Sequence, residues 1–201
     1  MTLDHLAVAG ETLEAAVAHV EAALGVKMGP GGEHEHFGTH NRLIGLADGL
    51  YLEAIAANPA AGALPFPRWF DLDRLQGAPR LGNWICRTDD MDKELARFDV
   101  DAGNVMHLTR GDLRWRMAVP DSGVLPFDNR FPALIQWDVV VTPAEILTPS
   151  GVALTRLEVA HPDAEALRVC VGLTDSRVEF VAGDPALQAT FDTPIGTRVL
   201  R

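Results

Sequence analysis

A histidine and a glutamate on two predicted strands are the residues of this chain best suited to chemistry. His5 lies in residues 3–8, which alternate as a strand does, and Glu53 lies in a second strand-like segment at 50–56. Two such strands can lie side by side and aim both side chains into one cavity. An imidazole and a carboxylate that meet in a cavity bind a metal ion or act as an acid/base pair.

Both residues also have a structural interpretation. A core histidine with satisfied hydrogen bonds is the alternative for His5, and a surface glutamate on an edge strand is the alternative for Glu53. We favour the cavity, because Glu53 alternates with Tyr51 and Ile55 in an otherwise apolar strand. An ionised carboxylate buried there needs a cation or a histidine to compensate its charge.

Two further polar candidates follow a glycine. His40 and Asn41 come directly after Gly38 and Thr39, where the backbone can bend towards a ligand, and their side chains offer both donors and acceptors. We expect His40 and Asn41 to orient a substrate, and we count His40 with His5 and Glu53 as a catalytic candidate.

A second histidine pair precedes them. His34 and His36 share one strand face at a spacing that can chelate a metal ion. Glu33 and Glu35 flank the pair just after a Gly-rich turn. We therefore interpret this segment as the solvated start of a strand.

Three tryptophans fall on three different predicted strands. Aromatic side chains on such strands form an apolar binding wall or fill the core. Core filling is the simpler interpretation for Trp84, Trp115 and Trp137. We nevertheless expect substrate contact from Trp84 first, because it takes the place of His5 in a second half of the chain.

These candidates belong to an order of elements that occurs twice. Residues 1–57 predict a strand, a helix and three strands, with Gly25 ending the helix. A packed connection at 58–80 contains four prolines and separates this module from a second one of the same order at 81–145. An offset of 79 residues aligns His5 with Trp84, which favours a duplicated half-domain.

The last part of the chain, residues 146–201, also predicts a strand, a helix and further strands. Pro162 stands in the first turn of that helix. We interpret the segment as a third, shortened module packed on the same domain, and an appended hairpin is the alternative.

Four phrases together resemble the glyoxalase-like domain family of the vicinal oxygen chelate superfamily. They are Leu3-Asp4-His5-Leu6, Gly38-Thr39-His40-Asn41, Tyr51-Leu52-Glu53 and Asp192-Thr193-Pro194-Ile195-Gly196. The resemblance implies an α+β fold in which paired βαβββ modules curl their mixed sheets around a cleft. It also implies a divalent metal (Zn, Ni, Fe or Mn), bound by residues from the first and fourth strands of each module.

In this sequence the first module has His5 and Glu53 at the ligand positions that the resemblance implies. The second module departs from the pattern, since its first strand has Trp84 and its fourth strand offers Gln136 or Asp138, depending on register. The four-ligand set is therefore incomplete.

Composition excludes several other classes of function. The net charge of −11 and the lack of a Lys/Arg cluster oppose binding to nucleic acid, although scattered arginines could clamp one small anion. No apolar stretch reaches the roughly 20 residues that cross a bilayer. Neither a secretion signal nor a dinucleotide or P-loop motif is present. Cys86 and Cys170 have no metal-binding spacing, and we interpret both as buried thiols.

We therefore expect a cytoplasmic small-molecule enzyme, monomeric or homodimeric, with no nucleotide cofactor. A metal held by His5 and Glu53 would act as a Lewis acid on vicinal oxygens, with a lyase, isomerase or dioxygenase outcome. The expected substrate contacts come from the following residues: Asn41, Trp84, Trp115, Gln136 and Asp138. The alternative is a protein that binds an aromatic or drug-like compound without turnover.

Overall fold

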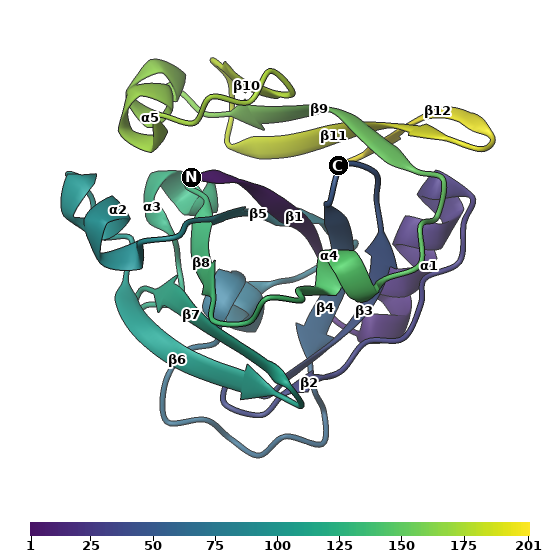
Figure 1. Ribbon diagram of the computed structural model, residues 1–201, viewed down its shortest axis with the longest axis horizontal. Coiled ribbons are helices and arrows are strands. Elements are labelled where there is room, and N and C mark those ends of the chain that lie inside the picture. Colours follow the sequence, from purple (N-terminus) through teal and green to yellow (C-terminus); the bar gives the residue numbers. More distant parts are fainter.

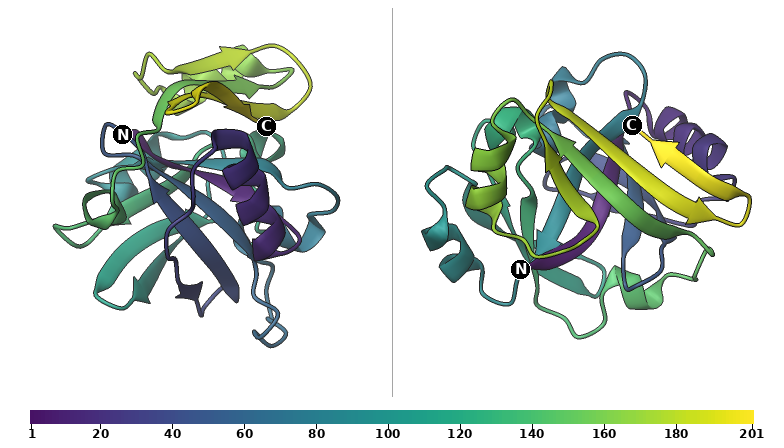
Figure 2. Two further views of the ribbon diagram at one scale, coloured as in Figure 1. Left: turned by 90° about the vertical axis from the view of Figure 1, so that its right-hand side faces the viewer. Right: turned by 90° about the horizontal axis from the view of Figure 1, so that it is seen from above.

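Two sheets of unequal size make up the fold in the computed structural model, which describes residues 1–201 (Figure 1). The larger sheet has eight strands in the order β2-β3-β4-β1-β5-β8-β7-β6 and is strongly curled. The smaller sheet has the order β10-β9-β11-β12 and lies over the outer side of the curled sheet, next to its middle strands β1 and β5 (Figure 1 and Figure 2). The fold is thus of the α+β class that the sequence predicts.

The first module supplies one half of the large sheet. It contains β1 (Thr2–Ala9), α1 (Leu13–Leu24), β2 (Glu33–His34), β3 (Thr39–Gly45) and β4 (Tyr51–Ala57). The hydroxyl of Thr12 caps α1 by accepting from the amide of Ala15, and Gly25 ends the helix in the left-handed conformation with φ 69°. The predicted helix and its glycine stop are confirmed.

The second module supplies the other half. It contains β5 (Arg80–Arg87), α2 (Met91–Arg97), β6 (Asn104–Arg110), β7 (Leu113–Val119) and β8 (Ala133–Trp137). Three short helices lie in the connections: η1 (Trp69–Arg74), α3 (Pro126–Asn129) and α4 (Pro143–Ile146). None of the helices is both long and apolar enough to cross a membrane.

Strand pairing repeats between the two modules. In each, the first strand is parallel to the fourth, so β1 pairs with β4 and β5 pairs with β8. The antiparallel pair β1·β5 joins the two halves. The duplicated order of elements therefore corresponds to a duplicated pattern of pairing.

The C-terminal part contains β9 (Ala153–Ala160), α5 (Ala164–Val171), β10 (Val178–Val181), β11 (Ala186–Thr193) and β12 (Gly196–Leu200). Its order of elements matches that of the two modules, but its pairing differs. The first strand, β9, is parallel to the second strand, β10, and antiparallel to β11. This sheet is thus a different arrangement that covers the modules from one side.

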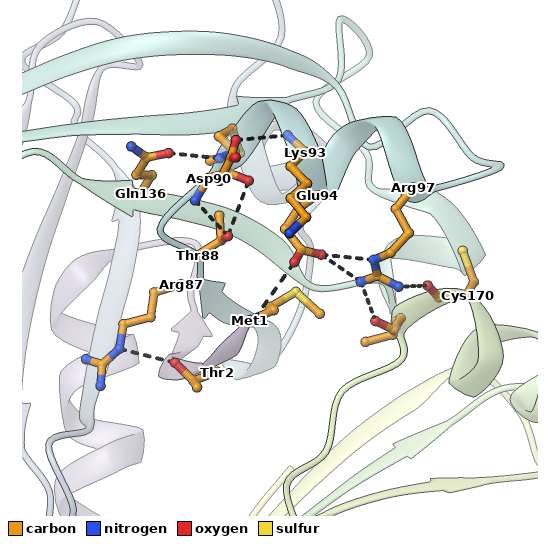
Figure 3. A network of polar contacts seen from close by, with 12 residues as sticks. Met1, Thr2, Arg87, Thr88, Asp90, Lys93, Glu94, Arg97, Gln136 and Cys170 are labelled. Atoms are coloured by element: carbon orange, nitrogen blue, oxygen red, sulfur yellow. Dashed lines mark hydrogen bonds and ion pairs between the residues drawn. The ribbon is translucent and has the colours of Figure 1, made fainter.

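A polar network ties α2 to the C-terminal part (Figure 3). The guanidinium of Arg97 donates to the carboxylate of Glu94 and to the backbone oxygens of Cys170 and Val171 at the end of α5. A cation at that position is favourable, because the last carbonyls of a helix carry a partial negative charge. The network fixes the second module against α5.

Candidate functional site

One pocket lies inside the curled sheet, with about 410 Å³ of unfilled space when its mouth is included. Strands of both modules and the connection between them form its wall. The wall residues are His5, His34, Asn41, Leu43, Tyr51, Glu53, Trp69, Phe70, Arg110, Trp115, Met117, Ile135 and Trp137.

A bulge in β1 gives His5 a carboxylate partner. Leu3 pairs with Cys86 and His5 pairs with Ile85, so Asp4 is an extra residue without a partner on β5. Its Oδ1 lies 2.6 Å from Nδ1 of His5. Asp4 and His5 are 1% and 5% exposed. The bulge therefore places an acid directly against a buried imidazole.

The environment of Asp4 keeps it ionised. Burial by itself raises the pKa of this carboxyl, but hydrogen bonds from His5 and Trp137 and the charges of His5 and Arg87 outweigh burial and lower the pKa below its ordinary value. The indole Nε1 of Trp137 donates to Asp4 Oδ2 at 3.1 Å. An ionised Asp4 requires a proton on Nδ1 of His5, which leaves Nε2 free for chemistry.

Nε2 of His5 faces the second carboxylate of the pocket, with 3.9 Å between Nε2 and Oε2 of Glu53. The imidazole stacks on Tyr51, with 4.2 Å between the ring centroids. Burial and the charges of Asp4 and Glu53 raise the pKa of Tyr51 well above its ordinary value, so this hydroxyl stays protonated. His5 and Glu53 thus meet in one cavity, as their strand positions predict.

Asn41 holds Glu53 in place. Its Nδ2 donates to Glu53 Oε1 at 2.5 Å, while its Oδ1 accepts from the amide of Gly32 at 2.8 Å and from Arg110 Nη1 at 3.3 Å. Two donors at Oδ1 fix the orientation of the amide group. Asn41 therefore couples Glu53 to the only Lys or Arg side chain on the pocket wall.

The Gly-rich turn before β2 packs directly on this amide. A Cβ atom at Gly31 would lie 1.8 Å from the backbone oxygen of Asn41, and one at Gly32 would lie 2.9 Å from Cδ of Arg110. A side chain is excluded at Gly31, because the turn approaches the backbone of Asn41 closely, whereas a side chain at Gly32 would displace the flexible side chain of Arg110. The turn acts as a brace for the site.

His34 is a wall residue and not the start of a solvated strand, which corrects the expectation for that segment. Its Nδ1 lies 3.1 Å from Oγ1 of Thr39 and its Nε2 lies 3.3 Å from Arg110 Nη1. Burial lowers the pKa of His34 to about 4, so the imidazole is neutral and Nε2 accepts from Arg110.

Aromatic residues close the remaining wall. Trp69 and Phe70 come from the connection between the modules, where Phe70 has a strained φ of 61°. Trp115 and Trp137 come from β7 and β8 and contact each other, with 5.7 Å between ring centroids. Trp115 therefore lies on the pocket wall, where a substrate contact requires it.

Trp84 does not reach this pocket, which corrects its expected position. It pairs with Leu6 and not with His5, and its ring lies 6.0 Å from that of Phe180 in the small sheet. Its indole nitrogen donates to the backbone oxygen of Arg130 at 2.8 Å. The alignment of His5 with Trp84 differs by one residue from the register of β1 and β5, in which His5 pairs with Ile85. A shift of one residue turns a side chain to the other face of the sheet.

Two candidates at the end of β8, one inside the strand and one just after it, also lie away from the pocket. Ile135 and Trp137 face inward, so Gln136 and Asp138 share the outer face at either register position. Gln136 Oε1 accepts from the amide of Met91 at 2.8 Å (Figure 3), and Asp138 is exposed. Neither residue is a pocket ligand, contrary to expectation.

His40 lies on the opposite face of β3 from the pocket. It alternates with Asn41, whose side chain occupies the inner face, and it is absent from the wall. Its Nε2 is buried without a hydrogen-bond partner. The structure therefore separates His40 from His5 and Glu53.

The donor set does not fit a four-ligand metal centre. His5 and Glu53 provide two donors, but the inward residues of the second module include Ile85, Ile135 and Trp137. No cluster of three or more His, Cys, Asp or Glu side chains has the spacing to hold a metal ion. The one Lys or Arg side chain on the wall is Arg110, whose charge repels a metal ion.

Paired βαβββ modules around a shared pocket define the class of vicinal oxygen chelate proteins. The chain belongs to the glyoxalase-like domain family, whose profile matches residues 3–186. No curated protein matches it significantly.

Solved structures are similar to this chain at low sequence identity. A hypothetical protein from Staphylococcus aureus is 12% identical with a TM-score of 0.60, covering 92% of this chain and 87% of that one. Methylmalonyl-CoA epimerase from Streptomyces coelicolor is 19% identical with a TM-score of 0.45, covering 71% and 99%. The epimerase from Mycobacterium tuberculosis is 16% identical with a TM-score of 0.44, covering 68% and 86%.

Proposed function

We propose that this protein is a small-molecule enzyme that moves a proton on a carbonyl compound, with His5 as the base. The observation that carries the proposal is the pairing of Asp4 with the pocket residue His5, with 2.6 Å between Oδ1 and Nδ1 and 3.9 Å between Nε2 and Oε2 of Glu53. A carboxylate on one ring nitrogen fixes the tautomer of an imidazole and makes the other nitrogen more basic. Because the donor set does not fit a metal centre, the proposed chemistry rests on side chains alone.

The proposed reaction begins at a C–H bond next to a carbonyl group. Nε2 of His5 takes the proton, and the electron pair of the C–H bond moves into the carbonyl to form an enolate. Asp4 stabilises the resulting imidazolium at Nδ1, and Glu53 stabilises it at Nε2. In a 2-hydroxy carbonyl compound, the hydroxyl proton then moves to the enolate oxygen while His5 returns its proton to the former carbonyl carbon, which gives isomerisation. Loss of a leaving group from the carbon next to the deprotonated one, with the electron pair of the enolate forming the new double bond and the imidazolium protonating the leaving group, gives a lyase reaction.

Solvent exchange of such protons tests the proposal. Short 2-oxo and 2-hydroxy carbonyl compounds, among them pyruvate and hydroxyacetone, are incubated with the protein in D2O, and loss of the C–H signal is followed by proton NMR. We expect His5→Gln to slow exchange by about 10²- to 10⁴-fold, the usual contribution of a positioned base. Glu53→Gln retains an acceptor for Asn41 and is expected to lose less.

The matched control is His107→Gln, which changes an exposed histidine on β6. It is expected to exchange protons at the wild-type rate. Equal exchange by wild type and His5→Gln would contradict the proposal. If a chelator abolished the exchange and Mn²⁺ or Zn²⁺ restored it, the reaction would depend on a metal ion, contrary to the proposal.

Binding without turnover is the second candidate, and the aromatic wall favours it. Tyr51, Trp69, Phe70, Trp115 and Trp137 surround the pocket and suit a flat ligand. Three of the four tryptophans of the chain line the pocket, so ligand binding should change the intrinsic fluorescence. Quenching by a compound that shows no exchange would support this candidate.

A further inference from the structure

Arg110 reaches across the pocket from one module to the other. It is the last residue of β6 in the second module, and its Nη1 lies 3.3 Å from Oδ1 of Asn41 and 3.3 Å from Nε2 of His34, both in the first module. The side chain is half-buried and packs on Gly32. These contacts hold the guanidinium on the pocket wall.

The guanidinium has no carboxylate partner. Arg68 and Arg97 each pair with an acidic side chain at 2.6 Å and 2.7 Å, but no Asp or Glu oxygen lies within 4.0 Å of Arg110. Both of its contacts are with neutral acceptors, since His34 is uncharged and Asn41 offers an amide oxygen. The positive charge in the pocket is thus uncompensated by direct contact.

Most of its donor capacity is unused as well. A guanidinium carries five N–H groups, and Arg110 makes hydrogen bonds within the protein through Nη1 alone. Neither its Nε nor its Nη2 is fully buried without a hydrogen-bond partner, so both atoms retain some accessible surface. A planar fork of free donors in a pocket matches the two oxygens of a carboxylate.

We propose that Arg110 binds a carboxylate of the substrate, so that the pocket takes small 2-oxo or 2-hydroxy acids. This inference rests on the proposed function for the identity of the reacting carbon. The amide of Asn41 separates the guanidinium from Glu53, with contacts of 3.3 Å and 2.5 Å at its two ends. A short acid fits this spacing, with its carboxylate at Arg110 and its neighbouring carbon towards Glu53 and His5. A single cation suits a monoanion better than a phosphate dianion.

Fluorescence titration with matched ligands tests the inference. Pyruvate, its uncharged methyl ester and inorganic phosphate are added at millimolar concentrations to wild type, Arg110→Gln and Arg110→Lys. We expect pyruvate to quench wild type most strongly and to bind Arg110→Gln about 10- to 100-fold more weakly, as for loss of a charge-assisted bidentate contact. The methyl ester should bind both proteins equally, and Arg110→Lys should lie between them.

Arg114→Gln is the control for net charge, because it removes an exposed guanidinium from β7. It should bind pyruvate as wild type does. Gly32→Ala is a second route to the same effect, since its Cβ would displace the Arg110 side chain, and it serves if Arg110→Gln fails to fold by circular dichroism. Its loss of affinity should again be selective for pyruvate.

The outcomes separate this inference from the proposed function. Equal binding of pyruvate and its ester, tighter binding of phosphate, or no quenching by pyruvate overturns the carboxylate site. Pyruvate that binds through Arg110 in a protein without proton exchange overturns the enzyme and leaves the carboxylate site standing. His5→Gln should retain pyruvate binding and lose exchange.

Discussion

The two modules share one backbone plan and differ in the chemistry of their inner faces. β1, β3 and β4 of the first module present His5, Asn41 and Glu53 to the pocket. Apart from Arg110, the corresponding wall of the second module is apolar and aromatic, with Ile135 and Trp137 on β8. Sheet pairing depends on the backbone, and therefore the same fold tolerates both walls. Both modules have the same order of strands, but the groups able to move a proton lie in the first module.

The second module contributes to the site through contacts with residues of the first module. It contributes a donor to Asp4 through Trp137 and a cation through Arg110. Both residues act across the pocket on partners from the first module. Variants in each module separately test this difference between the two halves of the pocket.

The largest expected effect is on the brace of the first module. In Gly31→Ala the new Cβ meets the backbone oxygen of Asn41 at 1.8 Å, so the turn or β3 must shift. We expect the free energy of unfolding in urea to fall by about 1–3 kcal/mol, typical of overpacking. Gly62→Ala is the control, since nothing lies within 4 Å of that position. An equal loss in both variants would contradict the brace.

A smaller effect concerns pH and His34. The folded imidazole takes up a proton only near pH 4, whereas the unfolded one does so near pH 6.5. Between these values the unfolded state binds more protons, so stability falls as the pH is lowered from about 6.5 to about 4. A fully buried group with this shift would lose about 3 kcal/mol, and the half-buried side chain of His34 is expected to lose less because solvent screens it. Above pH 6.5 the contribution is fully present.

The difference between wild type and His34→Gln isolates this group from carboxylates that titrate in the same range. Urea unfolding at several pH values should give a shallower slope for His34→Gln. His36→Gln changes an exposed histidine and should follow wild type. Parallel slopes for wild type and His34→Gln would show that the buried imidazole is protonated as readily in the folded state.

The smallest effect tests the contribution of the second module. Trp137→Phe removes the indole donor to Asp4 and should cost about 1 kcal/mol of stability while raising the pKa of Asp4, measured by carbon NMR of its carboxyl. Trp84→Phe removes an equivalent donor to the backbone of Arg130. It should cost similar stability and leave Asp4 unchanged. The same pKa shift in both variants would argue against a specific role for Trp137.

Local patterns predicted most elements because their causes are local. The helix at 13–24 ends at Gly25, and the strands at 104–110 and 113–119 lie where alternation and turns place them. The pairing of His5 with Glu53 in one cavity followed from two strands that alternate and lie together. Periodicity does not specify, however, which strands pair with one another. The strands of the C-terminal sheet accordingly pair in a different order from those of the modules.

The errors at the site come from register and from long-range contacts. The extra residue at Asp4 shifts β1 against β5, and no sequence period announces it, so Trp84 was assigned to the wrong face. Asp4 itself was missed for the same reason, although it stands next to His5. Arg110 was missed because its partner Asn41 is 69 positions away in the chain. The neutral His34 depends on burial by distant aromatic residues.

Because of the bulge at Asp4, the contact between Asp4 and His5 depends on the exact number of residues in β1. Removing one residue from the start of β1 would hardly alter composition or hydropathy, yet a regular ladder would then carry the acid and the imidazole to opposite sides of the sheet. Insertions and deletions near the N-terminus should therefore be more damaging to this protein than most exchanges of side chains there.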